Sequence, residues 1–161
     1  MVTIRRATDE DRDPIWKIIE PVIRKGDTYA FPPDIAKEAM LAIWTGPGKF
    51  TYVAILNDAV VGTFMMRDNQ PGQGSHVANA GYIVAVEYAG LGIGRKMGQF
   101  SLKEARKLGY RAMQFNLVVS TNQAAIHLWN KLGFEIIGEV PEAFHHKGKG
   151  YVSAYIMHRL L

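Results

Sequence analysis

The sequence predicts one mixed α/β domain whose elements follow the order βααβββαβαββ. The chain has 161 residues, a length that fits a single domain over 1–161. Its residues are 48% hydrophobic and 21% charged, which is the balance of an ordinary globular protein. Runs of β-branched and aromatic residues alternate with segments whose apolar residues recur at helical spacing, and this alternation indicates the element order.

The amino-terminal part predicts a strand and two helices. Residues 2–7 alternate weakly between apolar and polar side chains, as in a strand. A helix follows to about Lys25, because apolar residues recur at helical spacing: Ile15, Ile18, Ile19, Val22 and Ile23. The prolines of the loop over 27–33 exclude a helix there. Asp34 is placed to cap a second helix that ends near Gly46.

The rest of the chain predicts six strands and two helices. Residues 50–56 and 59–67 are rich in β-branched and aromatic residues, and the turn formers Asn57 and Asp58 between them indicate a hairpin. The later elements are a strand over about 76–86, a helix ending at Gly109, a strand over 110–119, a helix over 122–132 and strands over 134–140 and 151–160.

Composition argues against several classes of protein. No window approaches the roughly 20 apolar residues of a membrane helix, and the first residues lack the apolar core of a secretory signal, so we expect a cytoplasmic protein. The absence of cysteine excludes disulfides and thiolate chemistry, and no histidine spacing indicates a metal site. The net charge of +4 is spread along the chain without a docking motif, so no nucleic-acid partner is expected. A homodimer contact through the β-rich carboxyl end stays open.

The most informative stretch is the turn after the predicted strand over 76–86. Three glycines alternate at Gly90, Gly92 and Gly94, and a helix then begins with Arg95. The first amides of a helix have no internal partner, so small residues there let an anion such as a diphosphate approach the backbone. A dinucleotide turn would need a third glycine where Arg95 stands, and no Walker run occurs. A plain connecting turn is the remaining alternative.

A second motif lies roughly 30 residues further on, and the pair resembles the GNAT acetyltransferase superfamily. That family carries [RQ]-x-x-G-x-[GA] at a strand-to-helix turn and N-x-x-A-x-x-L-Y-x-K-x-G-F downstream. Here the corresponding runs are Ala89 to Gly94 and Asn122 to Phe134. The resemblance implies a central, mostly antiparallel twisted sheet flanked by helices, with acetyl-CoA as co-substrate.

The resemblance also assigns cofactor-binding residues. The backbone around Ile83 and Val84, at a splayed part of the strand, is expected to pair with the pantetheine amides and to polarise the thioester carbonyl. Asn122 is expected to hydrogen-bond the pantetheine arm, and Lys131 is either near the ribose phosphate or solvated. The diphosphate is expected on the amides of Gly90, Leu91, Gly92, Ile93, Gly94 and Arg95.

Two residues depart from the family pattern. The opening Arg or Gln is Ala89, which removes one side-chain contact to phosphate. The tyrosine of the second motif, whose hydroxyl often protonates the leaving thiolate, is Trp129. An indole N–H donates a hydrogen bond but is not an acid near neutral pH. Because a thiol with a pKa of about 8.5 leaves readily, water or the substrate's own proton suffices, and Trp129 is interpreted as a packing residue.

The predicted reaction is direct attack of an amine on the acetyl thioester, but the sequence identifies neither a general base nor a general acid. Glu87 lies beside the phosphates, and His76 is a second candidate for the base. Asn79 lies on the same strand face as Ile83. It is interpreted either as a structural residue or, through a looser resemblance to proline-analogue acetyltransferases that pairs it with Asn122, as a substrate-orienting group.

The acceptor is expected to be a small-molecule amine, an amino acid or an analogue. Tyr29 and Phe31 are predicted to wall its pocket, with Asp27 near an ammonium group, unless the two aromatic rings cap the core instead. Lys147 and Lys149, in a basic hairpin loop over 142–149, are candidates for a carboxylate. An idle acyl-CoA-binding sensor and a protein or peptide N-acetyltransferase are the alternative functions.

Overall fold

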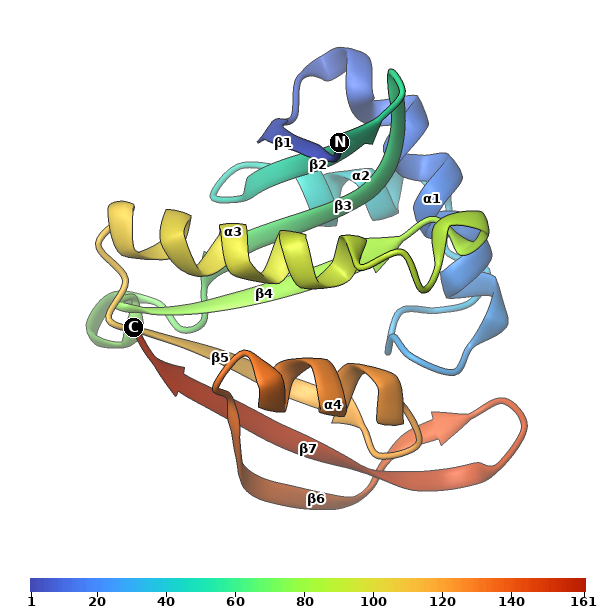
Figure 1. Cartoon of the computed structure of the whole chain (residues 1–161). Coiled ribbons are helices and arrows are strands. Elements are labelled where there is room, and N and C mark those ends of the chain that lie inside the picture. The colour runs from blue at the N-terminus through green and yellow to red at the C-terminus, as the bar shows by residue number, and fades with distance from the viewer.

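The chain forms one seven-stranded sheet with helices on both faces, and the computed structural model describes all 161 residues (Figure 1). The strand order is β1-β2-β3-β4-β5-β7-β6. Neighbouring strands are antiparallel except β4 and β5, which are parallel. The predicted mixed α/β class, the mostly antiparallel sheet and the element order are confirmed. No helix is both long and apolar enough to cross a membrane.

The strands are β1 (Thr3–Arg6), β2 (Phe50–Leu56), β3 (Ala59–Asp68), β4 (Val77–Val84), β5 (Ala112–Val119), β6 (Glu135–His146) and β7 (Gly150–Leu160). The α-helices are α1 (Arg12–Lys25), α2 (Lys37–Thr45), α3 (Ile93–Lys107) and α4 (Gln123–Lys131). Short 3₁₀ turns lie over Asp9–Asp11, Gly72–Gly74 and Val86–Tyr88. The last of these shortens the predicted strand over 76–86.

Two hydrophobic cores lie on opposite faces of the sheet. Helices α1 and α2 cover one face, where Ile15, Ile19 and Trp44 are fully buried. Helices α3 and α4 cover the other face, where Met97 and Trp129 pack against the strands. Because side chains alternate along a strand, Ile83 of β4 belongs to the first core and Ala78 to the second.

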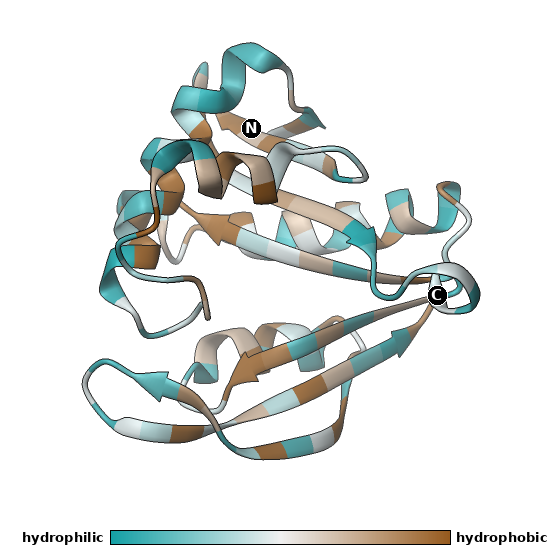
Figure 2. Cartoon of the chain, turned by 180° about the vertical axis from the view of Figure 1, so that it is seen from behind, coloured by the Kyte–Doolittle hydropathy of each residue, from teal (hydrophilic) through white to brown (hydrophobic).

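The sheet divides between β4 and β5. Only Val77 and Ala78 of β4 pair with β5, opposite Ala112 and Met113. Beyond Ala78 the two strands diverge, as Figures 1 and 2 show from opposite sides, and the loop after α1 reaches into the space between them. The expectation of a splayed part of β4 is therefore confirmed.

Two predicted boundaries were wrong. Asp34 does not cap α2, whose cap residue is Ala36. The amide of Ile35 instead donates to the carbonyl of Pro32 at 3.0 Å, so the chain first completes a turn. The predicted hairpin loop over 142–149 is also too long, because β6 continues to His146. A break in register between Val140 and Phe144, with Glu142 at φ 50°, carries the strand past Pro141, which has no amide to donate.

Candidate active site

The main-chain groups of β4 that face the β4–β5 gap form the centre of the site. Alternate residues of β4 direct their amides to opposite sides: the Ala85 amide donates to β3, whereas the His76 carbonyl accepts from Arg111 on the β5 side. By this alternation, Tyr82 and Val84 face the gap. The main chain of Ile83 faces β3, and its side chain is buried. Of the two predicted residues, only Val84 therefore presents backbone groups to the gap, and Tyr82 joins it.

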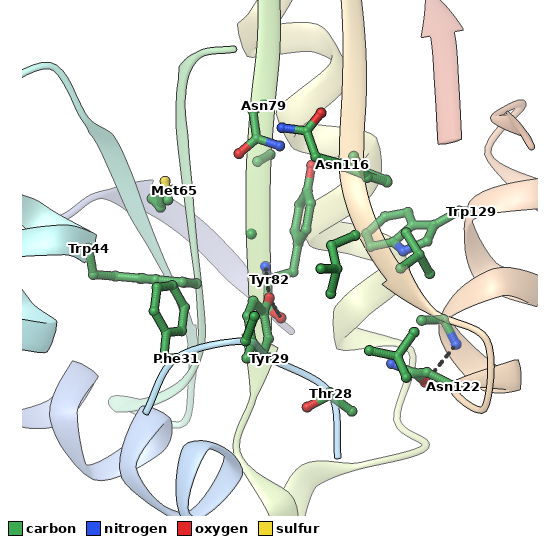
Figure 3. A pocket seen from close by; sticks show the side chains of 18 of the residues that line it. Thr28, Tyr29, Phe31, Trp44, Met65, Asn79, Tyr82, Asn116, Asn122 and Trp129 are labelled. Atoms are coloured by element: carbon green, nitrogen blue, oxygen red, sulfur yellow. Dashed lines mark hydrogen bonds between the residues drawn. The ribbon is translucent and has the colours of Figure 1, made fainter. Parts of the chain in front are cut away.

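The hydroxyl of Tyr29 occupies both backbone groups of Tyr82. It accepts a hydrogen bond from the Tyr82 amide at 2.9 Å and donates one to the Tyr82 carbonyl at 2.8 Å (Figure 3). Burial raises the pKa of Tyr29 to about 12, so the hydroxyl keeps its proton at neutral pH. A side chain from the loop after α1 thus satisfies the strand where β5 no longer does.

A cavity of about 560 Å³ lies in the gap, and most of its wall is apolar. Tyr29 and Phe31 line it, with their rings stacked at a centroid distance of 5.8 Å, and both rings also pack against the core under α1 and α2, so the structure agrees with both interpretations of them. Trp44 of α2 packs edge-on against Tyr29 at 6.3 Å and donates its indole N–H to Thr63 at 3.0 Å. These three rings come from two separate segments and form one side of the cavity (Figure 3).

A polar edge closes the narrow end of the cavity, where β4 and β5 begin to separate. Asn79 lines the cavity, and both ends of its amide already have partners. Its Nδ2 donates to the Gln114 carbonyl at 3.0 Å, and its Oδ1 accepts from Nε of Arg67 at 3.4 Å. Asn116 of β5 lies beside Asn79 (Figure 3). The hydrogen bonds agree with the structural interpretation of Asn79, while its place on the wall keeps the substrate-orienting role as a proposal.

The glycine turn lies at the opposite end of β4 and exposes a run of free amides. None of the N–H groups over 90–95 donates to any acceptor in the chain, and the first helical bond of α3 runs from Lys96 to Gly92. Gly90 and Gly92 have φ of 79° and 75°, and a methyl group added at either would meet nothing within 4 Å. Ile93 is buried, so only its amide is available, whereas Arg95 is exposed.

Asn122 and Trp129 lie on α4, on the side of the cavity opposite Tyr29. Asn122 caps the helix by accepting a hydrogen bond from the Ala125 amide at 3.3 Å, and it also lines the cavity. Trp129 packs against Tyr82 and Phe115 with ring centroids 4.7 Å away in both cases. It is 8% exposed, which agrees with its interpretation as a packing residue.

Several other candidate residues lie outside the cavity. His76 is exposed at the paired end of β4, and Glu87 is exposed in the turn before α3, so neither lines this cavity. Lys147 contacts the end of α1: its amide donates to the Gly26 carbonyl at 3.2 Å and its Nζ to the Arg24 carbonyl at 3.4 Å. The expectations that His76 approaches the amine and that Lys147 meets a substrate carboxylate are not supported by these positions.

Two smaller cavities contain the remaining charged residues that the sequence suggested. Asp27 and Lys149 share one of about 480 Å³ that also includes Thr28 and Asn122. Lys131 lies in another of about 490 Å³, with Lys103 and Arg106, near the far ends of α3 and α4. The chain brings no group of three or more His, Cys, Asp or Glu residues together as metal ligands.

The sequence missed Arg67, Asn116 and Trp44 as cavity residues. Each is a common residue inside an ordinary strand or helix, without a motif around it. The only indication was the register of the strands, because Arg67 of β3 lies opposite Asn79 of β4. That pairing could have been found by extending the predicted hairpin to the next strand.

Comparisons with known proteins agree with this geometry. The model of the acetyltransferase (GNAT) family matches residues 15–134. This range holds both the glycine turn and the second motif, so the predicted resemblance is confirmed. An N-acetyltransferase of Schizosaccharomyces pombe is 38% identical over 99 residues, which cover 61% of this chain and 47% of that protein. This chain spans about half the length of that relative.

Two solved structures extend the match to the whole fold. A GCN5-related N-acetyltransferase from Kribbella flavida is 42% identical, with a TM-score of 0.94 over 99% of this chain and 98% of that one. An acetyltransferase from Salmonella typhimurium, solved with its cofactor acetyl-CoA, has a TM-score of 0.89 at 24% identity, over 100% of this chain and 94% of that one. The second likeness concerns the fold alone.

Proposed function

This chain belongs to the GNAT acetyltransferase family, and on that premise we propose that it transfers the acetyl group of acetyl-CoA to the amine of a small molecule, an amino acid or an analogue. The observation that carries the proposal is the run of free amides over 90–95. This run lies beyond the end of β4, whose gap-facing main-chain groups at Val84 and Tyr82 lead to the wall of the cavity.

The residues of the turn fit a diphosphate. Six successive amides without partners, at the start of a fifteen-residue helix, attract an anion through hydrogen bonds and the helix field. The open space around Gly90 and Gly92 lets a ligand approach the backbone closely. Because Ala89 supplies no side-chain contact, the backbone of the turn must hold the diphosphate.

The gap fits the pantetheine arm, which carries amides of its own. An extended ligand that enters beside a strand pairs with its main-chain groups. Here those of Val84 face the gap without a strand partner, and those of Tyr82 become available when the Tyr29 hydroxyl moves away. Asn122 faces the arm from α4. Thr28 Oγ1, in the cavity wall near Asn122, is buried without a hydrogen-bond partner, so a ligand amide would satisfy it.

The Tyr82 amide and the Tyr29 hydroxyl are the proposed donors to the acyl oxygen. The Tyr82 amide donates to the Tyr29 hydroxyl, and the proton of that hydroxyl is directed at the Tyr82 carbonyl. When an acyl oxygen accepts from the Tyr82 amide, the Tyr29 hydroxyl turns its proton from the Tyr82 carbonyl to that oxygen and acts as a second donor. Donors held in place before the reaction stabilise the negative charge that develops there.

The acceptor amine is proposed to enter from the face covered by α1 and α2, between Phe31 and Asn79. No carboxylate or histidine lines the cavity, so the amine must arrive neutral or lose its proton to water. Trp129 cannot supply a proton to the thiolate of coenzyme A, which leaves as the anion because its thiol has a pKa of about 8.5. The share of the protein in catalysis is then orientation of the two reactants and stabilisation of the oxyanion.

The shape of the cavity favours a small acceptor over a protein or peptide. The loop with Tyr29 and Phe31 crosses the gap, and the tip of the β6–β7 hairpin is hydrogen-bonded to the end of α1 through Lys147. A polypeptide would need an open groove where these two segments lie. A small acceptor would instead lie against the rings of Phe31 and Trp44.

Two measurements test the proposal. Calorimetry with acetyl-CoA should give a dissociation constant in the micromolar range, and thiol release should rise when small amino acids are added. Binding without thiol release on any amine would favour the acyl-CoA sensor. Turnover confined to peptides would favour a protein acetyltransferase. No association with acetyl-CoA or coenzyme A at millimolar concentration would overturn the assignment altogether.

A further inference from the structure

A single charged side chain lines the main cavity, and it belongs to an exposed residue at its edge. Of its twenty lining residues, fourteen are hydrophobic, and the only ionisable group that carries a charge at neutral pH is Arg67. Arg67 lies at the end of β3, on the same sheet face as Met65 and Asn79, which is the face of the acceptor wall. Its guanidinium forms none of the six ion pairs in the structure.

The one hydrogen bond of Arg67 leaves most of its donors free. Nε donates to Oδ1 of Asn79 at 3.4 Å, and the two terminal nitrogens have no partner. An arginine presents five N–H donors in a planar fork that matches a carboxylate, and it keeps its charge at any physiological pH. Next to an apolar wall, such an unpaired cation favours an anionic ligand.

The anion that Arg67 meets is not the diphosphate of the co-substrate. The free amides over 90–95 lie beyond the opposite end of β4, on the side of the sheet where α3 begins. Lys147 and Lys149, the cations that the sequence suggested for a carboxylate, do not line this cavity, although Lys149 lines the smaller cavity that adjoins it at Thr28 and Asn122. Arg67 is therefore the one charged group on the acceptor wall itself.

We propose that Arg67 binds the carboxylate of the acceptor, and that the enzyme acetylates small amino acids or amino-acid analogues with an apolar body. This inference rests on the proposed function. The carboxylate lies against Arg67 at the edge formed by Asn79 and Asn116, the apolar part lies against Phe31 and Trp44, and the amine points toward Tyr82.

The register of the strands agrees with a ligand of this size. Arg67 is opposite Asn79, and Asn79 is three residues from Tyr82 along β4, which is about 10 Å of strand. A small amino acid fits within that span, with its carboxylate at Arg67 and its amine toward Tyr82.

The test compares matched acceptors in matched variants. The wild type, Arg67→Gln and Arg111→Gln would be assayed with an apolar amino acid and with its primary amide. Arg111 is an exposed arginine outside the cavity, so its variant loses the same charge near the sheet without touching the wall. The ratio of kcat/KM between variant and wild type is taken for each acceptor, which removes the difference in amine pKa between acid and amide.

We expect Arg67→Gln to lower kcat/KM for the amino acid by about 10- to 100-fold, the usual loss for a charge-assisted hydrogen bond, and to leave the amide within about threefold. Arg67→Lys should recover part of the loss, because it keeps the charge but not the fork. Arg111→Gln should change neither acceptor. Equal effects on acid and amide, or none on either, would overturn the role of Arg67 while leaving acetyl transfer intact.

A binding measurement separates this inference from the proposed function. Calorimetry with the amino acid in the presence of coenzyme A needs no turnover. Binding of the acid but not the amide, lost in Arg67→Gln, would support the carboxylate site even if no acetyl transfer were found. Turnover of neutral amines without any dependence on Arg67 would support the transferase and reject the carboxylate site.

Discussion

The two ends of the site are built in different ways. The cofactor turn is one continuous run over 90–95 that works through its amides, while the acceptor wall takes side chains from a loop, a helix and three strands. The turn needs particular backbone angles, which glycine spacing makes visible in a sequence. The wall needs residues that are far apart along the chain to meet, and only the topology brings Tyr29 to Tyr82.

The substitution with the largest expected effect disrupts the cofactor turn and leaves the acceptor wall intact. Gly92→Ala should weaken acetyl-CoA binding by about 100-fold in calorimetry, because a side chain at φ 75° displaces the amides that hold the diphosphate. Gly109→Ala is a matched control at the other end of α3, with φ 88° and equally open surroundings. Both should lose about 1 kcal/mol of stability. Equal affinity in the two variants would show that the turn only connects strand and helix.

The substitution with the next largest expected effect is at Tyr29, where the cofactor end of the site meets the acceptor wall. Tyr29→Phe should lower kcat by about 30-fold without weakening acetyl-CoA binding, because it removes one donor to the acyl oxygen and frees the backbone of Tyr82. With a pKa of about 12, Tyr29 stays protonated, so this loss should be constant between about pH 7 and 10. Tyr110→Phe, which removes a buried hydroxyl bonded to Asp68 at 2.7 Å, should leave kcat unchanged. A similar fall in both variants would mean a loss of structure.

A smaller effect is confined to the wall. Asn79→Ala should reduce turnover by about 10-fold and leave coenzyme A binding intact, because the side chain orients the acceptor beside Arg67. Steady-state kinetics together with calorimetry would check this. If affinity for coenzyme A and turnover fell together, Asn79 would be a structural link between β4 and β5 through Gln114.

The smallest effect concerns the residue that departs from the family. Trp129→Phe should keep kcat within about threefold, because the indole contributes packing and no proton. It should lower stability by about 1–2 kcal/mol, measured by denaturant unfolding, because contacts with Tyr82 and Phe115 are lost. A fall in kcat of more than tenfold in a folded variant would assign Trp129 a part in the reaction.

The cofactor turn and the acceptor wall also differ in how much of each could be predicted from the sequence. Element order and the glycine turn could be predicted because local periodicity and turn chemistry determine them. The sequence predicted that the main chain of Ile83 faces the gap, whereas the structure has Tyr82 there. Which residues of β4 direct their main-chain groups toward the gap depends on the register of β4 with β3. Arg67 could not be predicted, because a cation at a strand end is ordinary until the fold shows what surrounds it.

The unequal pairing of β4 has a consequence for exchange of its amide hydrogens with solvent. The amides that face β3 are held in a ladder, whereas those of Ala80 and Val84 face the gap without a strand partner. The exchange rate should therefore alternate along β4, slow for the amides that face β3 and fast for those that face the gap. Tyr82 is the exception, because Tyr29 covers its amide. The exchange rate at that one position would then report how often the loop after α1 lifts from the strand.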